Sequence, residues 1–188
     1  QFKAEIPITL INADPATAAG DLYQPENRLS PDKEVWYNAA SGVTQYHLPV
    51  VADSIVKVVV DGTETTAYTY ADGVVTFNSA PPVTNPPTNN TVRITYRKAN
   101  TDAYNSVMDC PYAIVYGGDQ NLCVVVGGCP AQPNAYFWSG NDELVMRANY
   151  FPMEHYNFAG DTESEIMGFG KQQGLLVVFS TKGVGKAS

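Results

Sequence analysis

The sequence predicts an all-β protein, and three observations carry that prediction. Most apolar runs are only four to six residues long and are rich in Val, Tyr and Phe, which suits strands and is too short for helices. The chain of 188 residues holds 15 Gly and 13 Pro, which are residues of tight turns. No long stretch repeats apolar residues at the helical spacing, so we expect few helices. A chain of this length can bury one sizeable core or two small ones.

Residues 1–28 predict one strand followed by a linker. The apolar run AEIPITLI, from Ala4 to Ile11, contains Pro7. Because proline has no N–H to donate to a ladder, we expect an edge strand or a bulge there. Residues 14–31 include the segments ADPATAAGD and QPEN, which favour an ordered but irregular connection.

Residues 29–98 predict a compact module of short antiparallel strands, arranged as a small sandwich or barrel. The strand candidates are 34–37, 44–48, 55–60, 68–70, 74–77 and 91–96. Asp61-Gly62 and Asp72-Gly73 are the strongest hairpin signals, because Gly supplies the positive φ that such turns require. Apolar and polar residues alternate in TVRITY, the last candidate, so one face should be buried and the other wet. The proline-rich residues 81–90 should form an exposed loop.

Residues 99–188 predict two antiparallel hairpins. The apolar runs lie at 111–116, 122–126, 136–138, 166–169 and 175–180. The spacers GGDQ (117–120) and GKQQG (170–174) have the length of hairpin turns. We expect residues 139–165 to be a long loop that connects the two hairpins.

Several short motifs in this last part of the chain occur in a fixed order. They are Gly127-Gly128 at a strand end, Pro133-Asn134, Trp138-Ser139-Gly140, Tyr150-Phe151-Pro152, a Gly near position 160, and Ile166 with Gly168 before an apolar strand. With these motifs, residues 110–180 resemble part of a β-propeller-like virion protein of tailed phages and prophages, of the structural, stabilisation or tail-tube type. The chain departs from that family where the family commonly has a longer Asn-Arg-Asp-like run before the aromatic-Ser step. In the family a module similar to residues 29–98 also sits between propeller strands.

The resemblance implies a non-enzymatic structural protein of the virion, a tail or head-tail connecting component assembled in the cytoplasm of the bacterial host. It implies other virion subunits as partners, with further copies of this chain among them. The implied architecture is a small antiparallel β-sandwich module inserted next to propeller-like antiparallel hairpins. A propeller has at least four blades of four strands, and the predicted strands suffice for roughly one blade. We therefore expect the rest of the ring in a longer polypeptide or in other copies.

The charge balance argues against nucleic acid or an anionic membrane as a partner. The net charge is −8, whereas phosphate binding draws on clustered Lys and Arg. Only Arg93, Arg97 and Lys98 come close to a cluster, and on an edge strand such charges discourage edge pairing. No run of eighteen apolar residues predicts a membrane span, and no leader is recognisable. Because the first residue is Gln1, we expect a processed chain or, as the preferred interpretation, an excerpt of a longer one.

No cofactor or metal site is predicted. Cys110, Cys123 and Cys129 lack the C-x-x-C spacing of zinc sites, and neither His47 nor His155 supplies a further ligand at short spacing. Cys110 and Cys129 each precede a proline at a strand end, so a disulfide between them is an alternative. The odd number of cysteines without a secretion signal favours reduced thiols.

The sequence predicts no catalytic residues. Ser139, His155 and Asp161 could be assembled into a triad on paper, but no G-x-S-x-G elbow accompanies them. Asp142 and Glu143 are adjacent, and adjacent residues on a strand point to opposite faces, so they cannot flank one glycosidic bond. We expect these polar groups to satisfy the backbone and water, and the chain not to be an enzyme.

Four aromatic residues of the expected long loop are candidate subunit contacts. They are Tyr150, Phe151, Tyr156 and Phe158. Aromatic residues in a loop must be covered, either by the protein's own face or by a neighbouring subunit. We favour the neighbouring subunit.

Trp36, Tyr37 and Tyr46 are candidate glycan contacts, because flat aromatic faces can bind the C–H face of a sugar ring without any charge. Packing within the sheets is the favoured interpretation of the module's aromatic residues. A weak glycan site would support the alternative function, a secreted carbohydrate-binding or adhesion β-sandwich module. That alternative predicts a leader peptide directly before Gln1.

Overall fold

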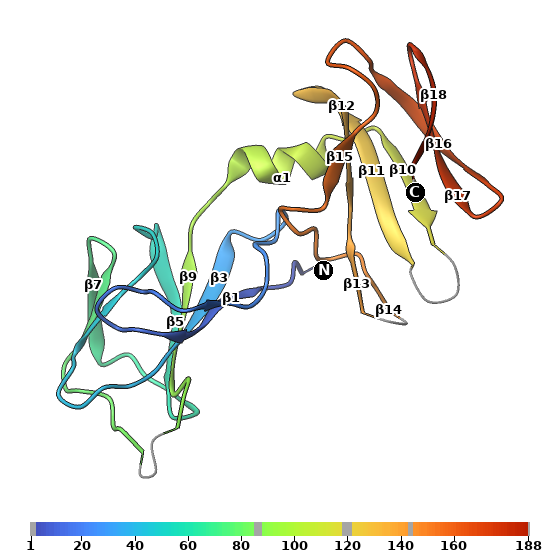
Figure 1. The fold of residues 1–188 in the computed structure, drawn as a ribbon. Helices are drawn as coiled ribbons and strands as arrows, with labels where there is room; N and C mark the ends of the chain where they lie inside the picture. Colours follow the sequence, from blue (N-terminus) through green and yellow to red (C-terminus); the bar gives the residue numbers. More distant parts are fainter. Residues whose placement is uncertain (1–2, 85–87, 118–121, 143–144, 188) are drawn as a thin grey trace. The chain divides into compact units, whose positions relative to one another are not determined.

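The structure is a computed structural model that describes residues 3–84, 88–117, 122–142 and 145–187 (Figure 1). The prediction of an all-β protein is confirmed, because the described chain consists mostly of strands in antiparallel sheets. One helix of eight residues, α1 (Thr101–Met108), occurs in the described ranges. Within those ranges, no helix has both the length and the apolar character needed to cross a membrane.

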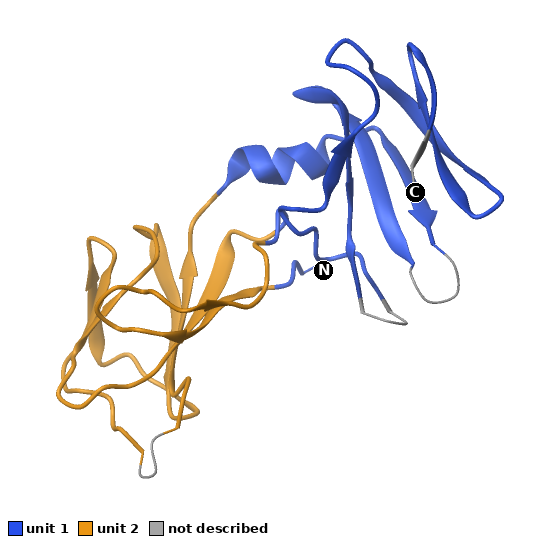
Figure 2. Ribbon diagram, in the orientation of Figure 1, with its two compact units in different colours: residues 1–5, 27–29, 100–188 blue, residues 6–26, 30–99 orange. Residues whose placement is uncertain are grey.

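The chain divides into two compact units (Figure 2). Unit 1 comprises Gln1–Glu5, Asn27–Leu29 and Asn100–Ser188, and unit 2 comprises Ile6–Glu26 and Ser30–Ala99. From Ile6 onward the first predicted strand therefore belongs to the same unit as the β module. Two short segments before residue 30 belong to the unit formed by Asn100–Ser188.

Unit 2 contains a six-stranded and a three-stranded sheet. The six-stranded sheet has the order β2 (Asp21–Leu22), β1 (Ile8–Ala13), β3 (Asp32–Tyr37), β9 (Val92–Arg97), β5 (Ser54–Val60) and β6 (Thr63–Glu64). The other has the order β4 (Gln45–His47), β8 (Val74–Phe77) and β7 (Tyr68–Ala71). Every strand predicted between residues 29 and 98 is present.

Of the two alternatives predicted for the first strand, β1 has the irregular register of a bulged strand and is not at the edge. It begins at Ile8, directly after Pro7, because proline cannot donate to the ladder. It is not an edge strand, since it lies between β2 and β3 and runs parallel to β3 with register shifts. The edge is β2, a strand of two residues inside the expected linker.

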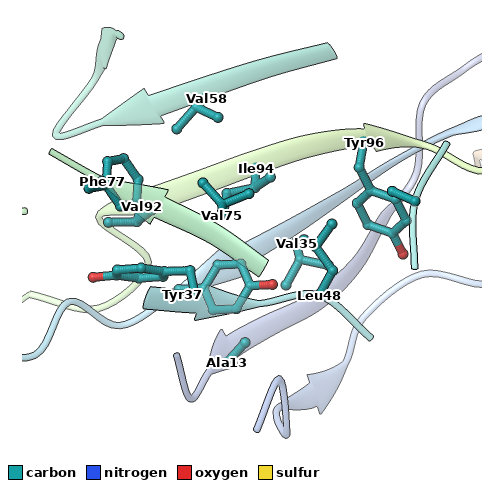
Figure 3. Close-up of a cluster of buried hydrophobic side chains, with 12 residues drawn as sticks. Ala13, Val35, Tyr37, Leu48, Val58, Val75, Phe77, Val92, Ile94 and Tyr96 are labelled. Carbon is teal, nitrogen blue, oxygen red and sulfur yellow. The ribbon is translucent and has the colours of Figure 1, made fainter. Parts of the chain in front are cut away.

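The core of unit 2 lies between its two sheets, as in a β-sandwich (Figure 3). Alternation places one face of β3 and one face of β9 inward, where Val35, Tyr37, Val92 and Ile94 are completely buried. Side chains of the smaller sheet, Tyr46, Val75 and Phe77, complete the cluster. Tyr46 contacts Tyr37 and Phe77 edge to face, with ring centroids 5.4 Å and 5.1 Å away.

Both Asp-Gly hairpin predictions are confirmed. Asp61 and Gly62 have φ values of 47° and 77°, and Asp72 and Gly73 have φ values of 50° and 82°. Two successive residues with positive φ are the mark of a type I′ turn, whose twist matches that of the strands. The turns connect β5 with β6 and β7 with β8.

Two buried tyrosines of this core give a matched prediction. The Tyr37 hydroxyl donates a hydrogen bond to the His47 carbonyl at 2.7 Å. Tyr37→Phe should lower the free energy of unfolding by about 1–2 kcal/mol, because the carbonyl loses a partner in a buried place. The Tyr46 hydroxyl is buried near the Ala40 backbone without a hydrogen bond of normal geometry. Tyr46→Phe should therefore change stability by less than about 0.5 kcal/mol or increase it.

Urea unfolding followed by circular dichroism measures both substitutions. Each substitution removes one hydroxyl from the same cluster, so the two variants differ only in whether a hydrogen bond is lost. Equal decreases in the free energy of unfolding would therefore contradict the hydrogen-bond assignment.

Unit 1 contains two larger sheets and a small hairpin. The four-stranded sheet has the order β10 (Tyr112–Tyr116), β11 (Cys123–Cys129), β12 (Gln132–Trp138) and β15 (Tyr156–Phe158). The three-stranded sheet has the order β16 (Ile166–Gln172), β17 (Leu175–Ser180) and β18 (Gly183–Ala187), and β13 (Gly140–Asp142) pairs with β14 (Val145–Arg147). The pairing of β10 with β11 and of β16 with β17 confirms the two predicted hairpins.

The prediction of a single long loop over residues 139–165 is wrong. This stretch contains the β13–β14 hairpin and β15, each strand being three residues long. Three residues are too few to show alternation in a sequence, which is why the strands were missed. Residues 85–87 of the predicted proline-rich loop, residues 118–120 of the predicted GGDQ turn, and Glu143 lie outside the described residues.

The four-stranded sheet of unit 1 is covered on both faces. On one face Val125 and Tyr136 pack against Ile166, Leu176 and Val178 of the three-stranded sheet. On the other face Val126, Ala135 and Phe137 pack with Leu29, Phe151 and Val107 of α1. Burial on both faces explains the unbroken apolar run in β11. Neither sheet closes into a barrel or a propeller within the described ranges.

Helix α1 was not expected from periodicity. Its N-cap residue, Asn100, accepts a hydrogen bond from the Ala103 N–H at 3.1 Å, and Asp102 lies in the first turn. An Asn cap and an acidic first turn are the standard start signals of a helix. The helix is too short for its two turns to produce a clear apolar stripe.

Candidate functional site

Unit 1 has a cavity of about 310 Å³ at one end of the interface between its two larger sheets. The lining residues come from six strands and the connections next to them. They are Tyr116, Cys123, Val125, Tyr136, Trp138, Ser139, Asn141, His155, Asn157 and Leu176. A concave, mainly apolar cavity with a few polar groups is the common form of a small-molecule site.

Strand alternation brings the apolar part of the lining together. Tyr136 and Trp138 lie two residues apart on β12 and share a face, as do Cys123 and Val125 on β11. The Tyr116 hydroxyl donates a hydrogen bond to the Gly174 carbonyl at 2.8 Å. This bond ties β10 to the β16–β17 turn and holds one wall in place.

Trp138 and His155 form a stacked pair in the lining, with ring centroids 5.3 Å apart and planes at 20°. Their strands are joined there by a hydrogen bond from the Trp138 N–H to the His155 carbonyl at 3.3 Å. His155 Nδ1 is buried without a hydrogen-bond partner among the described residues. Burial lowers the pKa of His155, so the ring is neutral at pH 7.

Two more titratable groups of the lining are also neutral at pH 7. Burial raises the pKa of the Cys123 thiol and the pKa of the Tyr136 hydroxyl above their ordinary values. None of the lining residues in the described chain is Asp, Glu, Lys or Arg. The described part of the lining therefore presents uncharged groups only.

Ser139 and His155, which sequence reasoning considered for a triad, both line the cavity. The Ser139 hydroxyl accepts a hydrogen bond from the Val124 N–H at 3.0 Å and donates one to the Gly140 carbonyl at 3.2 Å. It is thus engaged with the backbone. Asp161, the acidic residue considered for the triad, does not line the cavity. It accepts hydrogen bonds from Ser164 and Lys182.

The four candidate subunit contacts fall into two pairs. Tyr150 and Phe151 are 5% and 3% exposed, so they are covered by the chain itself and are not available to a neighbour. Tyr156 and Phe158 are 46% and 47% exposed. They lie on one face of β15, an edge strand, with their rings edge to face at 5.7 Å.

The three candidate glycan contacts do not form a platform. Tyr37 and Tyr46 are completely buried in the core of unit 2, because both point between its sheets. Trp36 points away from that core and is half-buried. The Arg93 guanidinium lies 4.0 Å from the centroid of its ring, and its indole N–H donates to Glu34. One face of the indole is therefore already occupied.

All three cysteines are free thiols, so the disulfide considered between Cys110 and Cys129 is not formed. Both thiols contact the last turn of α1. Cys110 Sγ donates to the Ser106 carbonyl at 3.1 Å, and Cys129 Sγ to the Asn105 carbonyl at 3.8 Å. Burial, with the neighbouring Cys129, raises the pKa of Cys110 to about 12. No group of three metal-ligating side chains occurs in the part of the chain that the structure describes.

Sequence reasoning identified the strands that surround the cavity but did not predict the cavity. The alternation in QPNAYFW places Tyr136 and Trp138 on one face, and this signal was available. The sequence did not indicate what packs against that face, because the three-stranded sheet that covers it comes from a later part of the chain, residues 166–187. Comparison of the chain with protein-family models, with curated proteins and with solved structures finds no match.

Proposed function

We propose that this chain is a non-enzymatic structural protein of a tailed-phage or prophage virion, a tail or head-tail connecting component, that works through contacts between the β surfaces of neighbouring subunits. The observation that carries the proposal is the exposed aromatic pair Tyr156 and Phe158 on the edge strand β15. The resemblance of residues 110–180 to virion proteins supplies the class of particle.

Strand β15 has the features of an assembly edge. It pairs only with β12 in the described chain, where Tyr156 lies opposite Phe137 and Phe158 lies opposite Ala135. On its other side the N–H groups of Tyr156 and Phe158 donate to the Glu154 carbonyl at 3.1 Å and to the Asn157 side-chain oxygen at 2.8 Å, so a further strand would replace these local hydrogen bonds. Aromatic residues next to such an edge add apolar area to the contact, and aromatic side chains often dominate interface energies.

The aromatic pair is supported from one side by Arg28. Its guanidinium carbon lies 4.6 Å from the centroid of the Phe137 ring and 5.6 Å from that of Tyr156. Its nitrogens donate to the Met153 carbonyl at 2.6 Å and to the Ser106 hydroxyl at 3.2 Å. A surface held in this way loses little side-chain freedom on binding, which favours affinity.

The sheet order of unit 1 supports the propeller part of the resemblance. The four strands of the first sheet lie side by side in chain order, with the β13–β14 hairpin between β12 and β15, and the next three strands form a meander packed on one face of that sheet. Successive propeller blades are four-stranded sheets of this kind. We propose that the two sheets are neighbouring blades and that further strands complete the ring.

Incorporation into particles tests the assembly edge. The double substitution Tyr156→Asp, Phe158→Asp places two charges on the proposed contact, and we expect at least a ~10-fold loss of incorporation, equivalent to about 1.4 kcal/mol. Quantitative mass spectrometry of purified particles from a complemented deletion strain measures the effect. Tyr104→Asp, at an exposed tyrosine of α1 in the same unit, is the matched control and should be incorporated normally. Normal incorporation of a folded double variant would contradict the proposed contact.

A further inference from the structure

We propose that the cavity between the two larger sheets of unit 1 is a binding site for one neutral sugar ring, a monosaccharide or the terminal unit of a glycan. The site is separate from the assembly edge and from the three aromatic residues of unit 2 considered above. Four properties of the cavity lead to this ligand class: its size, its apolar wall, its polar groups and the lack of charged side chains among its described lining residues.

The size of the cavity fits a single ring. Its volume of about 310 Å³ lies at the lower end of the range for small-molecule sites, which is roughly 300 to 1,000 Å³. An extended oligosaccharide would have to project from the opening.

The wall of the cavity is aromatic and aliphatic. Tyr116, Tyr136 and Trp138 contribute rings, and Val125 and Leu176 contribute aliphatic surface. A pyranose has two faces made of C–H groups, and such faces pack on aromatic and aliphatic side chains. The wall is also preformed, because the stack with His155 and the hydrogen bond from Tyr116 to Gly174 fix two of its rings.

Neutral polar groups lie in the same lining. Asn141 and Asn157 carry amides, which both donate and accept hydrogen bonds, and both residues are exposed. Asn157 Oδ1 already accepts a hydrogen bond from the Phe158 N–H at 2.8 Å, and its side chain hydrogen-bonds the Tyr136 hydroxyl, so a sugar would use the hydrogen-bonding capacity that remains. The neutral imidazole of His155 is a third polar group. Amides and a neutral imidazole match sugar hydroxyls, which likewise donate and accept.

The described residues of the lining include no Asp, Glu, Lys or Arg, and such a lining selects against ionised ligands. An anionic or cationic sugar placed there would lose hydration without meeting an opposite charge, which is costly. We therefore expect the site to discriminate between a neutral sugar and its ionised counterpart.

The fluorescence of Trp138 reports directly on the cavity. The chain has two tryptophans, so Trp36→Phe leaves Trp138 as the sole emitter. Titration of this variant with glucose, galactose, mannose and N-acetylglucosamine should give a saturable change with at least one of them, at millimolar concentrations. Glucuronate and glucosamine should bind at least ~10-fold more weakly. Absence of a saturable change with all four neutral sugars, or equal binding of the ionised ones, would overturn the proposal.

Two further variants locate the binding. Cys123→Phe, in the same Trp36→Phe background, fills the cavity from β11 and should abolish the change, whereas Asn157→Ala should weaken it at least ~3-fold. Asn105→Ala, at an exposed asparagine of α1 outside the cavity, should have no effect. Retained binding in a folded Cys123→Phe variant would show that the sugar binds elsewhere.

Alkylation of the unmodified protein keeps the proposal testable if Cys123→Phe fails to fold. Cys123 lines the cavity and Cys110 does not, so bound sugar should slow the reaction of Cys123 with iodoacetamide at least ~3-fold and leave Cys110 unchanged. Peptide mass spectrometry separates the two sites. Equal rates for Cys123 with and without saturating sugar would contradict the assignment.

Discussion

Asn27→Ala is expected to lower the free energy of unfolding of unit 1 by about 3–5 kcal/mol. The Asn27 side chain is 3% exposed and uses both ends of its amide. Its N–H groups donate to the carbonyls of Glu5 and Asn149 at 2.8 Å and 2.9 Å. Its oxygen accepts from the N–H groups of Leu29 and Phe151 at 3.1 Å and 2.9 Å. Alanine would leave four backbone groups without these partners in a largely buried place.

Denaturant unfolding in the Trp36→Phe background, where Trp138 of unit 1 is the sole tryptophan, measures this loss by fluorescence. Asn27→Asp keeps the accepting oxygen but turns a carboxylate toward two carbonyls, so it should also destabilise. Asn105→Ala is the control, because that side chain lies exposed on α1, and its effect should stay within about 0.5 kcal/mol. A loss below about 1 kcal/mol for Asn27→Ala would show that this amide does not join the three segments.

Phe137→Ala is the second substitution with a large expected effect, a loss of about 3–5 kcal/mol. Phe137 is 1% exposed and lies in the cluster that joins the four-stranded sheet to α1 and Phe151. Its ring also contacts the Arg28 guanidinium. Removing it leaves a cavity that neighbouring strands cannot fill, and the lost cation–π contact adds to the cost.

Phe158→Ala is the matched control for Phe137→Ala. Phe158 lies on the neighbouring strand but is 47% exposed, so its removal should cost the isolated chain less than about 1 kcal/mol. Thermal unfolding followed by circular dichroism compares the two. Equal shifts in midpoint temperature would contradict the assignment of Phe137 to the core and of Phe158 to the surface.

The sequence was informative where local chemistry decides the structure. Asp61-Gly62 and Asp72-Gly73 predicted two hairpins because few other residue pairs adopt two successive positive φ values, and both pairs do so. Alternation in β9 predicted a strand with a buried face, and Val92 and Ile94 are completely buried. Local signals of this kind do not depend on what the strand packs against.

Long-range pairing decides most of what the sequence did not predict. The parallel pairing of β1 with β3 has no signature within either strand. The hydrogen bonds of Asn27 reach Asn149 and Phe151, more than 120 positions away. The cavity lies where two sheets pack face to face. The alternation of apolar and polar residues in one sheet does not show which other sheet will pack against it.

The four loop aromatics illustrate the same limit within a single segment. A neighbouring subunit was the favoured cover for all four, with the protein's own face as the alternative, and the alternative holds for two of them. Phe151 joins a core cluster, and Tyr150 packs beside the Arg147 guanidinium at 4.6 Å. Tyr156 and Phe158 differ because β15 forms the edge of its sheet. Whether β15 lies at the edge depends on whether another strand pairs with its open side. The sequence of residues 139–165 does not show this.

The most direct test of the central claim is the copy number of this chain in particles made by the strain that encodes it. Particles purified by density gradient are digested, and peptides of the chain are quantified against those of the other structural subunits. The proposed role predicts a constant number of copies per particle across preparations. Peptides that are missing from the particles, or that vary in trace amounts while the free protein accumulates outside them, would contradict it.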